Sequence, residues 1–276
     1  MKAPIAVIIP SYNRAHLLPR AIDSVLRQRL PAAEMVVVDD GSEDETPAVL
    51  RGYGQQIRVL QQPNRGVSAA RNAGIAATTA PWIALLDSDD EWLPGKLAAQ
   101  WQLLSQQPQL RICHGEEIWI RHGKRVNPMK KHANSGGRIY CDSLPRCVIS
   151  PSAVVLQRSL LEQVGLFDET LPACEDYDLW LRICARETVG FVSDPLLIKY
   201  GGHADQLSRL HWGMDRFRVT ALRKRLDDPH LTPEERQATR CELQRKGQIL
   251  AQGAAKRGEQ GAAEYYQRLA LTGESA

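Results

Sequence analysis

The sequence lacks the features that place a protein in a membrane or send it across one. Its longest apolar runs, Ile5–Pro10 and Trp82–Leu86, are far shorter than the ~18–20 residues of a membrane-spanning helix. The chain also leads from Met1 straight into the first of these runs, without the charged and apolar regions of a signal peptide. We therefore expect a cytoplasmic protein, with peripheral contact to the inner face of a membrane as the alternative.

Cysteine motifs and a strong excess of charge are missing as well. The six cysteines form no C-x-x-C pair and have no zinc-like spacing to the seven histidines, which argues against a structural zinc site and a disulfide framework. The formal net charge is only +3, so we expect no nucleic-acid partner. Hydrophobic residues make up 43% and charged residues 24% of the chain, which is typical of a folded globular protein.

Short β-rich runs alternate with longer helical runs from residue 3 to about residue 106. Buried strands are expected at Ile5–Ile9, Met35–Val38, Ile57–Gln61 and Trp82–Leu86, with helices between them. Strands that alternate with helices indicate βαβ units. The sequence therefore predicts an α/β fold with a mostly parallel, Rossmann-like sheet flanked by helices.

The remainder of the chain is less regular and then becomes helical. Strands are expected near residues 111–120, 138–140, 152–156 and 191–200, and helices at Ser159–Val164 and Asp176–Ala185. The segment Thr232-Pro233-Glu234-Glu235 has the cap, the first-turn proline and the acidic residues that begin a helix. We expect residues 206–276 to form a C-terminal helical appendage, whose basic helix packs on its own domain rather than on an anionic membrane. A homodimer contact through the later helices is an alternative.

Polar segments follow three of the predicted strands. They are Pro10-Ser11-Tyr12-Asn13-Arg14, Asp39-Asp40 and Asp87-Ser88-Asp89-Asp90. The carboxyl ends of parallel strands meet at one edge of a sheet, where ligands bind. There an aromatic ring can stack on a base, an arginine can contact an anion, and a carboxylate can accept hydrogen bonds from a base or ribose. Carboxylates two residues apart point the same way along an extended chain, and such a pair suits Mg²⁺ or Mn²⁺ bound together with substrate phosphates.

Two common phosphate-binding loops are absent. No G-x-G-x-x-G follows the first predicted strand, and the chain contains no G-x-x-x-x-G-K-[ST]. These absences argue against a dinucleotide-dependent dehydrogenase and against a P-loop NTPase. A bound nucleotide must then have its phosphates held by a metal ion and arginine.

Together these motifs resemble the family 2 glycosyltransferases, which are enzymes of the GT-A fold. The resemblance covers residues 3 to about 205 and rests on Pro10–Arg14, Val38–Ser42, Asn64–Asn72, Leu86–Asp90 and Cys174–Arg182. It implies a glycosyltransferase domain over residues 1–205, with a nucleotide-binding half over about 1–106 and an acceptor and catalytic half over about 107–205. It also implies inverting transfer of a sugar from a nucleotide-diphospho-sugar, which we expect to be UDP-linked, to a saccharide or lipid-linked acceptor. Such an enzyme serves the synthesis of surface polysaccharides or glycoconjugates.

The resemblance also implies a nucleotide site and a metal site. The candidate nucleotide-binding residues are Pro10, Tyr12, Arg14, Asp40, Arg65, Arg71 and Asp87. The segment Asp87–Asp90 resembles the family's DxD motif, which binds Mn²⁺ or Mg²⁺. We expect Asp89 as the main ligand, and Asp87 and Asp90 are further candidates because the order D-S-D-D offers two registers. His203 matches a late histidine of related enzymes that contributes to the metal or diphosphate site.

A catalytic base is expected at the start of the helix that follows Cys174. Glu175-Asp176 resembles the family's late acidic pair, whose aspartate is the base, so we expect Asp176 in that role with Glu175 beside it. A positioned carboxylate that takes the proton of a sugar hydroxyl contributes about 10²–10⁴-fold to the rate. Trp92 directly follows the acidic motif, which makes its ring a candidate for stacking on a sugar.

Two other interpretations of the sequence stay open. A nucleotidyltransferase has a similar α/β core with metal-binding carboxylates, but it would need a glycine-rich triphosphate loop after the first strand. A non-catalytic nucleotide-sugar-binding or scaffold protein would have no activity for Asp176→Asn to remove.

Overall fold

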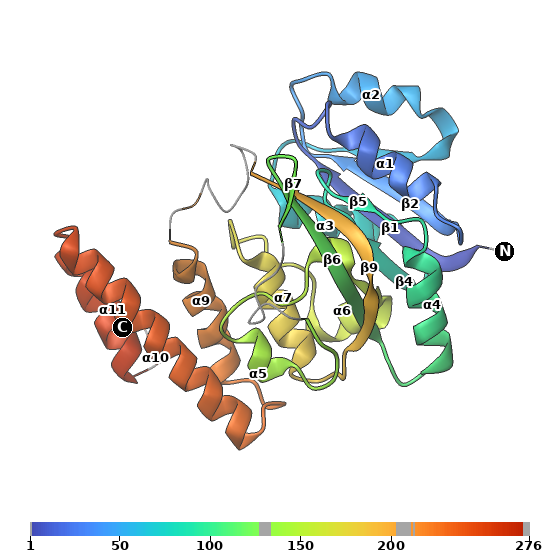
Figure 1. Cartoon of the computed structure of the whole chain (residues 1–276). Helices are drawn as coiled ribbons and strands as arrows, with labels where there is room; N and C mark the ends of the chain where they lie inside the picture. Colours follow the sequence, from blue (N-terminus) through green and yellow to red (C-terminus); the bar gives the residue numbers. More distant parts are fainter. Residues whose placement is uncertain (1, 127–133, 203–210, 212, 273–276) are drawn as a thin grey trace.

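One sheet runs through the protein and carries helices on both faces (Figure 1). The computed structural model describes residues 2–126, 134–202, 211 and 213–272. The strands in chain order are β1 (Ala3–Ser11), β2 (Ala32–Asp39), β3 (Arg58–Gln61), β4 (Trp82–Leu85), β5 (Glu91–Trp92), β6 (Ile112–Arg121), β7 (Lys124–Val126), β8 (Val155–Gln157) and β9 (Gly190–Gly201). The helices are α1 (Leu18–Leu26), α2 (Thr46–Gly52), α3 (Val67–Ala76), α4 (Lys96–Gln106), α5 (Tyr140–Ser143), α6 (Arg158–Val164), α7 (Glu175–Cys184), α9 (Asp215–Leu226), α10 (Pro233–Lys256) and α11 (Gln260–Thr272). Their strand order is β3-β2-β1-β4-β8-β6-β9-β5, and β7 pairs with β6.

The first half of the sheet is parallel, as the sequence predicts. β1 pairs in parallel with β2 and β4, and β2 pairs in parallel with β3. Successive residues of β1 point to opposite faces: Val7 packs in the core cluster that contains α1 and α4, and Ile8 packs in the cluster that contains α3 and α7. Burial on both faces explains why the strand is an unbroken apolar run rather than an alternating one. All four strands expected in this half form close to their predicted positions.

The α3 helix packs directly on this parallel sheet. A Cβ atom on Gly74 would lie 2.4 Å from Ile8 Cγ2 and 3.1 Å from Val38 Cγ2. Glycine is therefore required for the close approach of helix and sheet. This contact fixes the N-terminal end of α3 beside the carboxyl ends of β1 and β2.

The second half of the sheet is mixed, and two expected strands differ from the prediction. β8 is antiparallel to β4 and β6, whereas β9 is parallel to β6. The strand expected at 138–140 is wrong, because Tyr140 begins helix α5 and its hydroxyl bonds to the Thr239 hydroxyl at 2.8 Å. The strand expected at 152–156 starts later, because Pro151–Ala153 forms a 3-10 turn before β8. Ile139 and Tyr140 thus pack under helices, whereas the turn at Pro151–Ala153 lies beside β4, β6 and β9.

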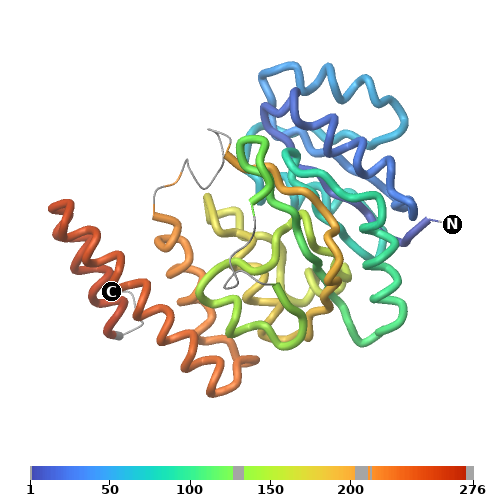
Figure 2. The backbone as a smooth tube through the Cα atoms, viewed as in Figure 1, coloured from blue at the N-terminus to red at the C-terminus, as the bar shows by residue number. Residues whose placement is uncertain are grey.

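The C-terminal helices leave the sheet and continue its helical layer. Val219 and Leu222 of α9 are buried in the same core cluster as α7, so this helix packs on its own domain, as favoured from the sequence. α10 begins at the predicted cap: Thr232 Oγ1 accepts a hydrogen bond from the Glu235 N–H, and the Glu235 side chain accepts one from the Thr232 N–H. Figure 2 shows α10 and α11 side by side, reaching away from the sheet. Within the described ranges, no helix is both long and apolar enough to cross a bilayer.

Candidate active site

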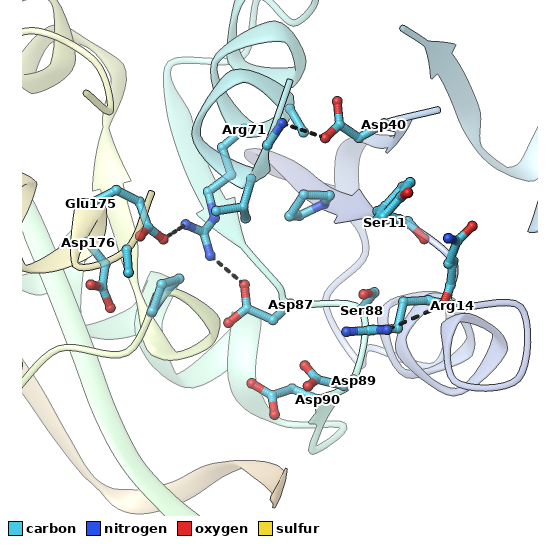
Figure 3. A pocket seen from close by; sticks show the side chains of 18 of the residues that line it. Ser11, Arg14, Asp40, Arg71, Asp87, Ser88, Asp89, Asp90, Glu175 and Asp176 are labelled. Atoms are coloured by element: carbon cyan, nitrogen blue, oxygen red, sulfur yellow. Dashed lines mark hydrogen bonds and ion pairs between the residues drawn. The ribbon is translucent and has the colours of Figure 1, made fainter. Parts of the chain in front are cut away.

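A cavity of about 800 Å³ opens at the carboxyl ends of β1, β2 and β4 (Figure 3). Its other walls come from α3, α7, β6 and β9. The predicted site residues that line it are Pro10, Tyr12, Arg14, Asp40, Arg71, Asp87, Asp89, Asp90, Glu175 and Asp176. Arg65 is not among the lining residues, and its guanidinium pairs with Glu169 at 2.7 Å. His203 falls outside the described residues. The three polar segments expected at one edge of the sheet thus meet in one cavity.

The loops after β1 and β2 are tied to each other. The Asn13 N–H donates to Ser42 Oγ at 2.9 Å, and Asn13 Oδ1 accepts from the Glu43 N–H at 2.8 Å. Asp39 Oδ1 accepts from the Ser42 N–H at 3.0 Å, which closes the turn after β2. Asn13 itself has φ 52°, a left-handed conformation that asparagine tolerates better than most residues. This network holds the Pro10–Arg14 segment against the cavity.

Asp40 organises the loop that precedes α3. Its carboxylate accepts hydrogen bonds from Gln62 Nε2 at 2.7 Å, from the Arg65 N–H at 3.0 Å and from the Gly66 N–H at 2.8 Å. Tyr12, 42% exposed, leaves its ring free at the rim, and Ser11 Oγ is buried in the cavity wall without a partner among the described residues. This wall therefore offers an aromatic face and polar groups to a flat heterocyclic ligand.

The acids that follow β4 have different partners. Asp87 Oδ1 pairs with Arg71 Nη2 at 2.7 Å. Asp90 is buried, accepts a hydrogen bond from Ser152 Oγ at 2.6 Å and lies 3.5 Å from Lys199 Nζ. Burial raises the pKa of Asp90 to about 7. In the part of the chain that the structure describes, Asp89 is the acid of this segment whose carboxylate has no side-chain partner.

Arg71 joins the two sides of the cavity. Its guanidinium, which is 3% exposed, contacts Asp87 with one nitrogen and Glu175 Oε1 with another, each at 2.7 Å. Burial alone lowers the pKa of Arg71, but the two carboxylates together raise it above its ordinary value. We predicted Arg71 as a nucleotide ligand from the sequence, and here its charge is already balanced by protein carboxylates. It links the acidic segment after β4 to the start of α7.

Glu175 and Asp176 begin helix α7 with distinct environments. Cys174 caps the helix with φ 62°, and the positive end of the helix favours ionised carboxylates in this first turn. Glu175 is buried against Arg71; burial raises the pKa of Glu175, Asp176 raises it further, and Arg71 lowers it. Asp176 lines the cavity, and its Oδ2 accepts a hydrogen bond from Cys147 Sγ at 3.4 Å. Both acids line the cavity, but Asp176 is the less buried of the two, whereas the carboxylate of Glu175 is held by Arg71.

Sequence reasoning missed several residues of the site and misplaced one. Trp92 does not face the cavity: it is 2% exposed, and its indole N–H donates to the Ser152 carbonyl at 2.8 Å. Trp119 of β6 lines the cavity instead, together with Lys199 of β9. Neither belongs to a polar segment after a predicted strand, so only the strand register could have revealed them. The interpretation of Trp92 was wrong because the local sequence does not indicate which tryptophan side chain is buried in the core.

The acids at the cavity suit a divalent cation in combination with a phosphate ligand. Among residues 2–126, 134–202, 211 and 213–272, no group of three or more His, Cys, Asp or Glu side chains forms a complete metal cage. Mg²⁺ and Mn²⁺ do not require one, because they are held by one or two carboxylates with phosphate and water. Burial and the charge of Asp87 raise the pKa of Asp89, so negative charge at this position is under-compensated. The donor set at Asp89 and Asp87 therefore fits such an ion.

Comparisons with known proteins agree with this geometry. Residues 6–164 match the family model described as Glycosyl transferase family 2. The chain is 32% identical over 212 residues to an uncharacterized glycosyltransferase of Rickettsia bellii, a match that covers 74% of this chain but only 31% of that relative. It is also 32% identical over 195 residues to the UDP-Glc:alpha-D-GlcNAc-diphosphoundecaprenol beta-1,3-glucosyltransferase WfgD of Escherichia coli, over 68% of this chain and 73% of WfgD.

Solved structures share the fold. Staphylococcus aureus TarS (residues 1–349) in complex with UDP-GlcNAc superposes with a TM-score of 0.68 at 16% identity, over 99% of this chain and 93% of that one. The mannosyltransferase PcManGT of Pyrobaculum calidifontis, in complex with GDP-Man and Mn²⁺, gives a TM-score of 0.64 at 17% identity, over 100% of this chain and 89% of that one. These likenesses establish the expected α/β architecture with its curled sheet.

Proposed function

Since the chain belongs to glycosyltransferase family 2, we propose that it is a metal-dependent, inverting enzyme that moves a sugar from a nucleotide-diphospho-sugar to an acceptor hydroxyl. The observation that carries the proposal is the pair Asp89 and Asp176, which line one cavity from two different segments, the loop after β4 and the start of α7 (Figure 3). The family assignment and a relative whose name specifies glucosyl transfer support it.

The donor belongs on the wall formed by the loops after β1, β2 and β4. Tyr12 provides a face on which the base stacks, and Asp40, which lines the same wall, holds the neighbouring loop in place. A divalent cation held by Asp89 and Asp87 stabilises the negative charge on the departing nucleoside diphosphate. We propose a UDP-sugar as donor, supported by the UDP-Glc in the name of WfgD and the UDP-GlcNAc bound to TarS.

The acceptor belongs on the opposite wall, beside α7. A sugar hydroxyl is a weak nucleophile, and Asp176 takes its proton as the new bond forms. Attack from the Asp176 side with departure toward Asp89 places nucleophile and leaving group on opposite faces of the transferred sugar, which inverts its anomeric centre. Glu175 does not share this role in the proposal, because its carboxylate is engaged by Arg71.

We further propose that the acceptor is a saccharide on a lipid diphosphate, in polysaccharide or glycoconjugate synthesis. The diphosphoundecaprenol acceptor in the name of WfgD supports this. A cytoplasmic enzyme that works at the membrane surface is consistent with such an acceptor, and the α10–α11 pair is available for a homodimer contact.

A melting-temperature panel tests the donor site directly. UDP, GDP, dTDP and CDP are each added with Mn²⁺ or with EDTA, and a ligand that binds only the folded protein adds about 2.7 kcal/mol at a hundredfold excess over its Kd. We expect UDP to raise the melting temperature with Mn²⁺, and Asp89→Ala to abolish the rise. Glu43→Ala, which removes an exposed acid near the same edge, is the matched control and should keep it. If no nucleotide shifts the melt under either condition, the proposed function is wrong.

A further inference from the structure

The hairpin of β6 and β7 reaches the cavity through Trp119, which the proposed donor site does not use. β6 and β7 pair with Trp119 opposite Val126, Ile120 opposite Arg125 and Arg121 opposite Lys124. Residues directly opposite in an antiparallel pair share a face, and so do residues two apart on one strand. Trp119, Arg121 and Lys124 therefore lie on one face of the hairpin, and Arg125 lies on the other.

The face that carries Trp119 is the face that looks into the cavity. Trp119 lines the cavity together with Lys199, its partner in the parallel β6–β9 ladder. The Arg121 guanidinium carbon lies 5.6 Å from the centre of the Trp119 ring, on the same side of the strand. Arg121 is about 6.6 Å further along the strand than Trp119. An aromatic face at the cavity is thus followed by cations toward the solvent.

The hairpin is held in this position by its turn and by its neighbour. His122 and Gly123 have φ 49° and 73°, the two left-handed residues of a tight two-residue turn. Gly202, at the end of β9, lies so close that a Cβ atom there would be 2.8 Å from His122 Cε1. The tip is therefore packed against the end of β9, whose residue Tyr200 also lines the cavity.

The two cations recorded near the Trp119 ring, Arg121 and Lys199, differ in their availability to a ligand. Lys199 also lies 5.3 Å from that ring, but its amine is bound to Ser150 Oγ at 2.8 Å and pairs with Asp90. Arg121 and Lys124 are exposed, and the sequence from residue 118 to 126, Ile-Trp-Ile-Arg-His-Gly-Lys-Arg-Val, contains no acid. The positive charges of Arg121 and Lys124 therefore face the solvent, whereas that of Lys199 is paired within the site.

We propose that Trp119, Arg121 and Lys124 form an acceptor subsite for a sugar that carries a phosphate or diphosphate group. The sugar ring stacks its apolar face on the Trp119 indole, and the phosphate pairs with Arg121 and Lys124 one step further along the hairpin. The subsite deepens the proposed function, on which it rests, because it names the residues that recognise the acceptor and the charge that this acceptor must carry. In this proposal the phosphate belongs to the acceptor. The test also shows whether the cations bind the lipid headgroups of a membrane surface instead.

The test compares two probes on the full chain. They are N-acetylglucosamine 1-diphosphate with a short alkyl tail and the uncharged methyl glycoside of the same sugar, each titrated by calorimetry with and without saturating UDP and Mn²⁺. We expect the diphosphate probe to bind at least about tenfold more tightly, because charge-assisted hydrogen bonds are the stronger kind. Arg121→Ala and Lys124→Ala should each weaken that probe about five- to tenfold and leave the methyl glycoside unchanged. Trp119→Ala should weaken both probes, and Trp119→Phe should restore them.

Arg125→Ala is the matched control, since it removes an exposed arginine of the same hairpin from the opposite face. An equal loss in Arg125→Ala, or binding of all variants to phosphatidylglycerol vesicles in proportion to charge, would replace the subsite by a membrane contact. No binding of the diphosphate probe to the wild type, no loss in Arg121→Ala, or a weaker UDP affinity in that variant would also overturn the proposal. If UDP does not bind but the affinity of the diphosphate probe still drops in Arg121→Ala, the acceptor subsite is supported and the proposed donor site is wrong.

Discussion

Replacement of Arg71 by methionine should destabilise the protein far more than loss of an ordinary ion pair. The Arg71 guanidinium is 3% exposed and is the cation between Asp87 and Glu175, with both contacts at 2.7 Å. Methionine keeps much of the side-chain length and removes the charge. The variant therefore leaves two carboxylates facing each other without their counter-ion, at the point where the acidic segment after β4 meets α7.

The magnitude follows from the burial of the two acids. Removing one partner of a buried ion pair costs about 3–5 kcal/mol, because the remaining charge is left uncompensated. The Glu175 side chain is 6% exposed and gains little from water, whereas the Asp87 side chain is 25% exposed and can be partly solvated. We therefore expect a loss near the lower end, about 3 kcal/mol, or about 6–12 °C in melting temperature for a chain of this size.

Urea unfolding of three variants checks this reasoning. Arg65→Met is the matched control, because it breaks an arginine–carboxylate pair of the same 2.7 Å length whose side chains are 61% and 38% exposed; it should cost at most about 1 kcal/mol. The double variant Arg71→Met/Glu175→Gln should recover part of the loss, since the most buried unpaired charge is gone. Equal losses in Arg71→Met and Arg65→Met, or no recovery in the double variant, would refute the account.

Three further predictions concern the proposed base, a buried lysine and the α3 contact. Asp176→Asn should lower kcat by about 10²–10⁴-fold and leave the UDP–Mn²⁺ melting shift unchanged, and undiminished turnover would remove Asp176 as the base. Burial lowers the pKa of Lys96 from 10.5 to about 7, so between these values the unfolded chain binds more protons and stability rises with pH. Urea unfolding at several pH values should show this rise in the wild type and a flatter curve in Lys96→Met; parallel curves would contradict it. Gly74→Ala should cost about 1–3 kcal/mol because its methyl group overlaps Ile8, whereas Gly261→Ala, with open space around its Cβ, should not destabilise, as differential scanning calorimetry can verify.

The first half of the chain was predictable because its signals are local. A strand buried on both faces is an uninterrupted apolar run, and β1 and β2 were found where such runs occur. Because the strands are parallel, the segments that follow them lie at the same edge of the sheet. The Pro10–Arg14 segment, Asp40 and the Asp87–Asp90 segment were therefore identified as neighbours before any contact between them was known.

The second half was less predictable because its pairing is not local. β8 has three residues and pairs with β4 and β6 from far along the chain. Ile139 and Tyr140 have the β propensity expected of a strand, but they are buried under helices and begin α5. Propensity is overridden where an apolar residue finds a better-packed partner in another element. Which tryptophan reaches the cavity, Trp92 or Trp119, depends on the same long-range choice.

Besides Asp40, the sequence indicated five acids of the site, but not the partners that divide these five into two kinds. Asp87, Asp90 and Glu175 are each held by a buried cation or hydroxyl, so their charge is part of the fold. Asp89 and Asp176 line the cavity and form no ion pair among the described residues. Charge kept uncompensated at a site lowers stability in exchange for function. A neutral amide at Asp89 should therefore leave the unfolding free energy unchanged or raise it, whereas an amide at Glu175 should lower it. Unfolding free energies in the opposite order would mean that Asp89 is structural.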